Sequence, residues 1–97
     1  MKLSDINDID SVLGESFSNG GLVLDQSDLG ESFFDLKTGL AGALFQKFVN
    51  YNQKLSLLLN DTRIYGDRFA ELALEHRDHP NVRFFDTKED AQNWISH

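Results

Sequence analysis

The sequence predicts an α/β fold in which three short parallel strands alternate with four helices, in the order α-β-α-β-α-β-α. Short apolar runs at residues 22–24, 55–59 and 82–85 indicate buried strands, because turn residues bound each run. Longer segments with helical spacing separate these runs, which requires parallel pairing through right-handed crossovers. The 97 residues are expected to form a single domain, since a second would be too small to bury its own core.

Charge is unevenly distributed along the chain, whose formal net charge is −7. Residues 1–35 contain one lysine and eight acidic side chains, whereas basic and acidic side chains balance over residues 36–97. The acidic first third disfavours nucleic-acid binding, and a solvated face is favoured over an acidic docking surface. The chain has no cysteine, which excludes disulfides and thiolate metal sites, and no apolar signal or membrane span. We therefore expect a cytoplasmic protein with no membrane partner.

The first helix is predicted to begin with Ser4 as its N-cap and to end at Asn19, before two glycines. Its apolar residues recur at helical spacing. They are Ile6, Ile9, Val12, Leu13 and Phe17.

The second helix is predicted from Leu36 to about Asn52, with Asp35 as its N-cap. Placing its residues at helical intervals gathers one apolar half, which we expect to form the core face. The members of this half are Leu40, Ala41, Leu44, Phe45, Phe48, Val49 and Tyr51. The opposite side is small or polar and consists of Gly39, Gly42, Ala43, Gln46 and Asn50. An interior helical glycine costs about 1 kcal/mol relative to alanine, so two glycines facing away from the sheet indicate either a contact outside the chain or a weak helix that faces solvent.

Two further helices complete the pattern. Asp67 is the expected cap of the third helix, which buries Phe69, Leu72 and Ala73 and ends near Pro80. Thr87, followed three residues later by Asp90, resembles a capping box for the last helix. Ala91, Trp94 and Ile95 are expected to pack that helix, and the phenylalanines are interpreted as core residues.

The string Phe-Phe-Asp-Leu-Lys-Thr-Gly-Leu-Ala-Gly at residues 33–42 resembles a bacterial family known as domain of unknown function 4180. Leu44, residues 46–51, residues 54–55, Asp61 and the helix around Phe69 extend the resemblance, which covers most of the chain from Leu22. The family's architecture is similar to that of STAS domains, the fold of anti-sigma-factor antagonists. The resemblance thus implies a single STAS-like domain over residues 1–97 that binds protein partners.

In STAS domains a serine or threonine at the start of the equivalent helix can be phosphorylated, which switches partner binding. The resemblance gives this role to Thr38, and the amides of a first helical turn favour a phosphate. The alternative, which the residues favour, is an ordinary first turn capped by Asp35. The family also begins with a β-hairpin, and this sequence starts at the first helix, so an open sheet edge is expected that a second chain could cover. The loop 62–65 departs from the family's Ser/Lys-rich sequence.

Asp25, Asp61 and Asp86 each follow a predicted strand. Ligands bind at the carboxyl edge of open α/β sheets, and convergent carboxylates can hold Mg²⁺. The spacing matches no known metal motif, and aspartate is common after strands, so a metal here is the weaker interpretation. His76 and His79 form an H-x-x-H pair that lacks a third ligand.

These patterns favour a small non-enzymatic regulatory or interaction domain without a cofactor. Its partner is a protein or a second copy of the chain, and a homodimer is the expected assembly. The predicted contact residues are Asp35, Thr38, Gly39, Gly42, Ala43, Gln46 and Asn50. The alternative is a small-molecule, Mg²⁺-binding or phosphotransfer domain with its site at the carboxyl edge of the sheet.

Overall fold

Three parallel strands form the centre of the computed structural model, which describes residues 3–96. They are β1 (Leu22–Asp25), β2 (Leu55–Leu58) and β3 (Val82–Phe85), in the spatial order β1-β2-β3. The register aligns Leu22 with Leu55 and Leu55 with Val82. The predicted α/β class and parallel sheet are therefore confirmed, with β1 and β3 at the two edges of the sheet.

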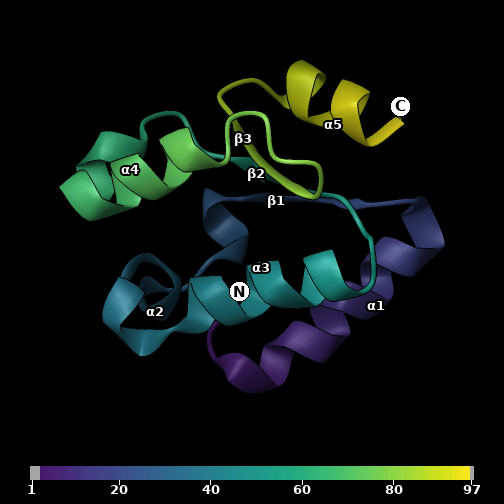
Figure 1. The fold of residues 1–97 in the computed structure, drawn as a ribbon, viewed down its shortest axis with the longest axis horizontal. Helices are drawn as coiled ribbons and strands as arrows, with labels where there is room; N and C mark the ends of the chain where they lie inside the picture. The colour runs from purple at the N-terminus through teal and green to yellow at the C-terminus, as the bar shows by residue number, and fades with distance from the viewer. Residues whose placement is uncertain (1–2, 97) are drawn as a thin grey trace.

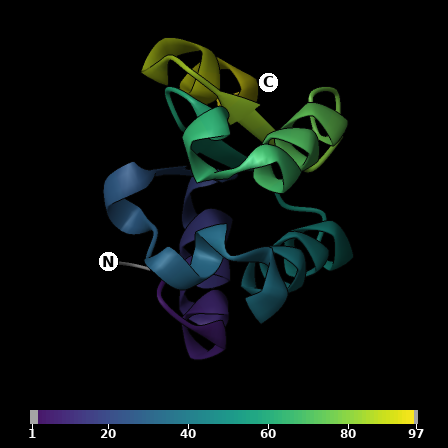
Figure 2. The same cartoon turned by 90° about the vertical axis from the view of Figure 1, so that its left-hand side faces the viewer.

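The helices cover both faces of this sheet (Figures 1 and 2). The four longer ones are α1 (Ile9–Asn19), α3 (Leu40–Asn50), α4 (Asp67–Glu75) and α5 (Lys88–Ser96). A fifth, α2 (Glu31–Phe34), is a single turn that lies between β1 and α3. α5 lies on one face of the sheet, and α1 and α3 lie on the other. No helix within residues 3–96 has the length and apolar character needed to cross a membrane.

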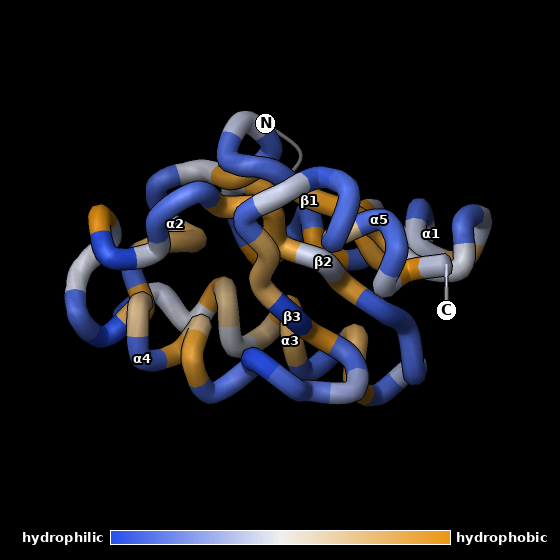
Figure 3. The backbone as a smooth tube through the Cα atoms, turned by 90° about the horizontal axis from the view of Figure 1, so that it is seen from above, coloured by the Kyte–Doolittle hydropathy of each residue, from blue (hydrophilic) through white to orange (hydrophobic). Residues whose placement is uncertain are grey.

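Side chains of the strands alternate between the two faces of the sheet. One face packs against the main apolar core, and the other is covered by α5. Leu24, Leu55 and Leu57 are fully buried and belong to the main core with α1 and α3. Along β1 and β2 the apolar residues concentrate at the centre, while the surrounding loops are hydrophilic (Figure 3). Ser56 points to the other face, where its hydroxyl donates to the Ala91 carbonyl of α5 at 2.9 Å.

The last helix is anchored by polar contacts as well as by burial. The Lys54 ammonium donates to the Trp94 carbonyl at 3.1 Å, close to the C-terminus of α5, where a cation is favourable. The Trp94 ring also lies 4.8 Å from the Arg83 guanidinium carbon and is only partly buried. The predicted cap is present, because the Asp90 amide donates to the Thr87 hydroxyl.

The chain enters the first helix differently from the prediction. Asp5, rather than Ser4, caps a 3₁₀ turn (Ile6–Asp8) by accepting the Asn7 amide at 2.7 Å, and α1 begins only at Ile9. The N-terminal segment is fixed because Leu3 is fully buried and pairs with Leu29 in an isolated parallel bridge. The predicted end of the first helix at Asn19 is confirmed.

Six aromatic side chains form one cluster between α3, α4 and β3, which we call the aromatic cluster. Phe33 is fully buried at its centre, with ring centroids 5.3 Å from Phe34, 6.2 Å from Phe45 and 5.9 Å from Phe69. Phe69 in turn meets Phe84 of β3 edge to face, at 5.8 Å. The members are Phe33, Phe34, Phe45, Tyr65, Phe69 and Phe84.

The turn between α4 and β3 depends on His79. α4 ends at Glu75, earlier than the predicted end near Pro80. The His79 Nδ1 atom accepts the amides of Asn81 at 3.0 Å and Val82 at 3.1 Å, so this nitrogen carries no proton. Burial lowers the pKa of His79 below its ordinary value of 6.5, and electrostatic repulsion from the neighbouring His76 and Arg83 lowers it further.

We expect Phe33→Ala to reduce the free energy of unfolding by about 3–5 kcal/mol, because it leaves a cavity inside the aromatic cluster. The exposed Phe17 provides the matched control, since Phe17→Ala removes the same ring from a side chain that is 54% exposed. Its cost should stay below about 1 kcal/mol when both variants are measured at a protein concentration at which the chain is monomeric. Urea denaturation measures both values, and equal losses would contradict the central position of Phe33.

We also expect stability to fall as the pH is lowered from 7.5 to 5.5. The unfolded chain protonates its histidine at the ordinary pKa, whereas the fold resists protonation of His79, so acid favours the unfolded state in this window. The aspartates with lowered pKa values act only at lower pH. In His79→Asn, an amide oxygen can accept the same backbone amides without titrating, so this variant should lose much of the pH dependence. Urea denaturation at the two pH values tests this, and an unchanged dependence would contradict the role of His79.

Candidate functional site

The segment that leads into α3 is a turn and not the first turn of a long helix. Asp35 accepts the Lys37 amide at 3.1 Å and caps a 3₁₀ turn (Leu36–Thr38) instead of α3 itself. Gly39 then takes a left-handed conformation with φ of 74°, and α3 begins at Leu40. The predicted start at Leu36 is therefore wrong. The left-handed conformation explains the glycine at position 39 from within the chain.

Thr38 is exposed, and its hydroxyl closes this turn. Its Oγ1 atom lies 2.7 Å from the Ser32 carbonyl and 2.9 Å from the Asp35 carbonyl, to either of which it can donate. The same oxygen accepts the Leu40 amide, the first of α3, at 3.2 Å. Thr38 thus connects α2, the 3₁₀ turn and α3. A phosphate on Oγ1 would remove the proton that this atom donates, so phosphorylation would alter the turn as well as add charge.

The outward side of α3 is small and polar, as the sequence indicated. Gly42, Gln46 and Asn50 are exposed, and Ala43 is partly buried. A Cβ atom added at Gly42 would meet no atom of the described residues within 4 Å. The Gln46 side-chain amide donates to the Asn50 side-chain oxygen Oδ1 at 2.8 Å, one turn along the helix. The glycine at position 42 therefore has no packing reason within residues 3–96.

Three apolar side chains assigned to the core lie on the surface instead. Val49 is 40% exposed, Tyr51 is 53% exposed and Phe17 is 54% exposed. α3 ends at Asn50, so Tyr51 leaves the helix and its ring meets that of Phe17 from α1 at 6.1 Å. The predicted helix continued to about Asn52, which put Tyr51 on its core face. Val49 and Phe17 lie within α3 and α1, whose buried stripes are narrower than the apolar patterns of the sequence.

We use the name α3 outer face for the small and polar outward side of α3 together with the apolar side chains exposed at its C-terminal end. Lys47 is the single charged residue of α3, and its ammonium lies 3.7 Å from an Asp10 carboxylate oxygen of α1. The surface is therefore nearly neutral in a strongly acidic chain. Its members are Gly42, Ala43, Gln46, Val49, Asn50, Tyr51 and Phe17.

Asp35 lies outside the α3 outer face, beside a groove of about 490 Å³. The groove is bounded by the segment before α3 and by the start of α4, and it also includes Lys37 and Tyr65. The Tyr65 ring stacks on Phe34 at 3.8 Å between centroids. Its hydroxyl oxygen is buried without a hydrogen-bond partner among the described residues, and burial raises the pKa of Tyr65.

The three aspartates at the carboxyl edge of the sheet have separate local roles. Asp25 caps a 3₁₀ turn (Gln26–Asp28), and hydrogen bonds from Ser27 lower the pKa of its carboxyl group. Asp61 accepts the Arg63 amide and guanidinium at 2.9 and 3.0 Å, which lowers its pKa, and Asp86 is exposed. Within residues 3–96, no group of three or more carboxylate or imidazole side chains is placed to hold a metal ion.

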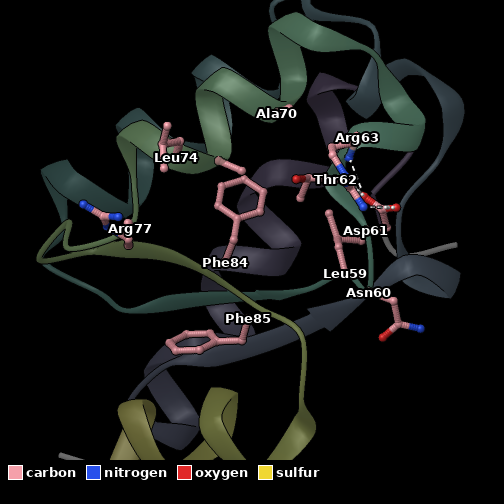
Figure 4. Close-up of a pocket in the computed structure, with 11 residues that line it drawn as sticks. Leu59, Asn60, Asp61, Thr62, Arg63, Ala70, Leu74, Arg77, Phe84 and Phe85 are labelled. Atoms are coloured by element: carbon pink, nitrogen blue, oxygen red, sulfur yellow. Dashed lines mark hydrogen bonds and ion pairs between the residues drawn. The ribbon is translucent and has the colours of Figure 1, made fainter.

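A larger groove of about 530 Å³ opens at the same edge, between α4 and β3, and we call it the carboxyl-edge groove (Figure 4). Phe84 points from β3 toward α4, whereas the neighbouring Phe85 points toward α5. Leu59 and Thr62 lie at the strand end, and Arg77 stands at the far side of Phe84. The sequence had indicated this edge, but through its aspartates and not through an apolar groove.

Replacing Thr38 by valine, which keeps the side-chain shape without the hydroxyl, should lower the free energy of unfolding by about 0.5–1.5 kcal/mol. Thr38→Ser retains the hydroxyl and is the matched control, with an expected loss near the lower end of that range or below it. Thermal and urea unfolding of the two variants measure the difference. Equal stability of Thr38→Val and wild type would show that the turn does not depend on this hydroxyl.

Comparison with known proteins places the chain in a family. No curated protein and no solved structure matches it at a significant level. A family model, the domain of unknown function DUF4180, matches residues 1–95, which includes the first helix as well as the segment from Leu22 onward. Because this match spans nearly the whole sequence, the chain belongs to the DUF4180 family.

Proposed function

We propose that this protein is a non-enzymatic interaction module that associates with a second copy of itself through the α3 outer face. The observation that carries the proposal is the open position at Gly42 on the small, uncharged outward side of α3, together with the rings of Phe17 and Tyr51 that are exposed at the C-terminal end of the same helix. Exposed apolar groups that lie together, next to small residues, are typical of protein contacts.

Small residues favour close approach of a second helix. Without a side chain at Gly42, and with only a methyl group at Ala43, a neighbouring backbone can come near the axis of α3. Val49 and the two rings can then bury apolar area around that contact, as aromatic side chains do at interface centres. A twofold axis through this surface would make every contact twice.

Charge also favours a second copy at this position. Two chains of formal charge −7 repel each other, so association is least unfavourable where each presents few acidic groups. α3 carries no acidic residue, and Lys47 is held beside Asp10 of the adjacent helix. The α3 outer face is thus a surface at which two acidic copies can meet with little direct repulsion.

The resemblance to STAS domains supports the same helix as the contact element. The residues nearest to its start, Asp35, Thr38 and Gly39, are engaged in the turn before α3, so we place the centre of the contact further along the helix. In this proposal a phosphate on Thr38 would act indirectly, by altering the turn that sets the start of α3.

Gly42→Gln should weaken self-association at least tenfold, because it places a long side chain where the proposed contact needs a second backbone to approach α3 closely. The variant should be as stable as wild type or more stable, by about 0.5–1 kcal/mol, since glutamine is the better helix former. Sedimentation velocity over a range of concentrations gives the association constant, and circular dichroism gives the stability.

Ser96→Gln is the matched control, because it adds similar bulk to an exposed position of α5, away from α3. It should leave the association constant unchanged. A wild-type protein that stays monomeric at millimolar concentration would overturn self-association. Equal effects of the two substitutions would move the contact away from α3.

A further inference from the structure

The carboxyl-edge groove has the size and the position of a ligand site. Its volume of about 530 Å³ lies within the range of about 300–1,000 Å³ that is usual for small-molecule pockets. It opens beyond the carboxyl end of β2 and beside that of β3, which is where open parallel sheets bind ligands. The groove shares no residue with the α3 outer face, so its role is independent of self-association.

The inner surface of the groove is apolar and formed by several elements. Phe84 forms the floor, with Leu59 from the end of β2 beside it. The opposite wall is α4, which contributes Ala70, Ala73 and Leu74. Leu74 is 64% exposed, so its apolar surface at the rim is open to a ligand in the groove.

The charges around the groove are positive overall. Arg63 and Arg77 line it together with one acid, Asp61, which leaves a net charge of +1 in a chain of formal charge −7. Two of the four arginines of the sequence thus lie at this site. Figure 4 shows Arg77 and Arg63 on opposite sides of Phe84, so the apolar floor lies between two guanidinium groups.

The two arginines are differently engaged. Asp61 binds Arg63 through contacts of 3.0 and 3.3 Å to its guanidinium, which neutralise much of its charge. Arg77 approaches Asp78 only at 3.9 Å, and its side chain is 74% exposed. Arg77 is therefore the more available guanidinium for an anion, and guanidinium groups bind carboxylates with matching geometry.

We propose that the carboxyl-edge groove binds a small amphipathic anion, in which an apolar body lies on Phe84 between β3 and α4 and a carboxylate pairs with Arg77. The apolar surface gives affinity by burial, and the guanidinium selects the negative end. Asp61 opposes the binding, because its carboxylate faces the same groove and occupies Arg63.

Three probes test whether both halves of the ligand are needed. Decanoate carries the apolar body and the carboxylate, decanol carries the body alone, and acetate carries the charge alone. Below its micellar concentration, decanoate should bind saturably and shift the amide NMR signals of Leu59, Thr62 and Phe84. Decanol should bind about fivefold more weakly, which corresponds to one exposed charge pair, and acetate should not saturate.

Matched substitutions then test the named charges. Arg77→Glu should weaken decanoate binding about fivefold, whereas Arg68→Glu, an identical change of charge at an exposed position of α4 outside the groove, should change it less than about twofold. Asp61→Asn should strengthen binding about threefold, because it releases Arg63 while retaining an acceptor for the Arg63 amide.

Thermal unfolding of each variant shows whether it is folded, so a loss of binding can be distinguished from a loss of the fold. Equal affinity for decanoate and decanol would show that the ligand needs no negative charge. Equal effects of Arg77→Glu and Arg68→Glu would show that decanoate responds to the net charge of the protein and does not pair with Arg77. Amide shifts that are spread over the whole molecule, or confined to the α3 outer face, would show that the groove is not the site.

Discussion

Packing around Phe33 is the constraint on which the rest of the structure depends. This ring is fully buried and contacts Phe45 of α3 and Phe69 of α4. These two helices are separated in the chain by β2. Phe69 contacts Phe84 of β3, so one set of edge-to-face rings joins the segment before α3 to the far edge of the sheet. The short sheet contributes few side chains of its own, and the aromatic cluster supplies much of the buried area that holds α4 against it.

That constraint explains the irregular segment before α3. To bury Phe33, the chain forms α2, turns at residues 36–38 and reverses at Gly39, whose positive φ a larger residue would adopt only with strain. Thr38 and Asp35 satisfy backbone groups that this reversal would otherwise leave unpaired. The conspicuous string at residues 33–42 is thus explained largely by local structure, and Gly42 is the position within it that the described residues leave unexplained.

Elements governed by simple periodicity could be predicted from the sequence, whereas those governed by long-range contacts could not. The three strands and the four longer helices follow apolar patterns, and they were predicted with small errors at their ends. α3 ends before Tyr51, and the neighbouring elements bury only part of the apolar patterns of α1 and α3, so Tyr51, Phe17 and Val49 lie on the surface although helical spacing assigns them to the core. The carboxyl-edge groove combines residues from the loop after β2, from α4 and from β3, and no local pattern indicates that their side chains leave a space between them.

The side chains of α4 explain why that space exists. Ala70 and Ala73 line the groove from α4, opposite Phe84. Leucine is also a good helix former, and leucines at these two positions would extend toward Phe84 and fill the gap. Each such replacement would bury several methylene groups at about 0.8 kcal/mol apiece, provided the surroundings accept the volume. The open groove therefore represents stability that this sequence forgoes. A ligand that binds this groove in the folded state alone would restore part of that stability, so the proposed occupation links the two alanines to binding.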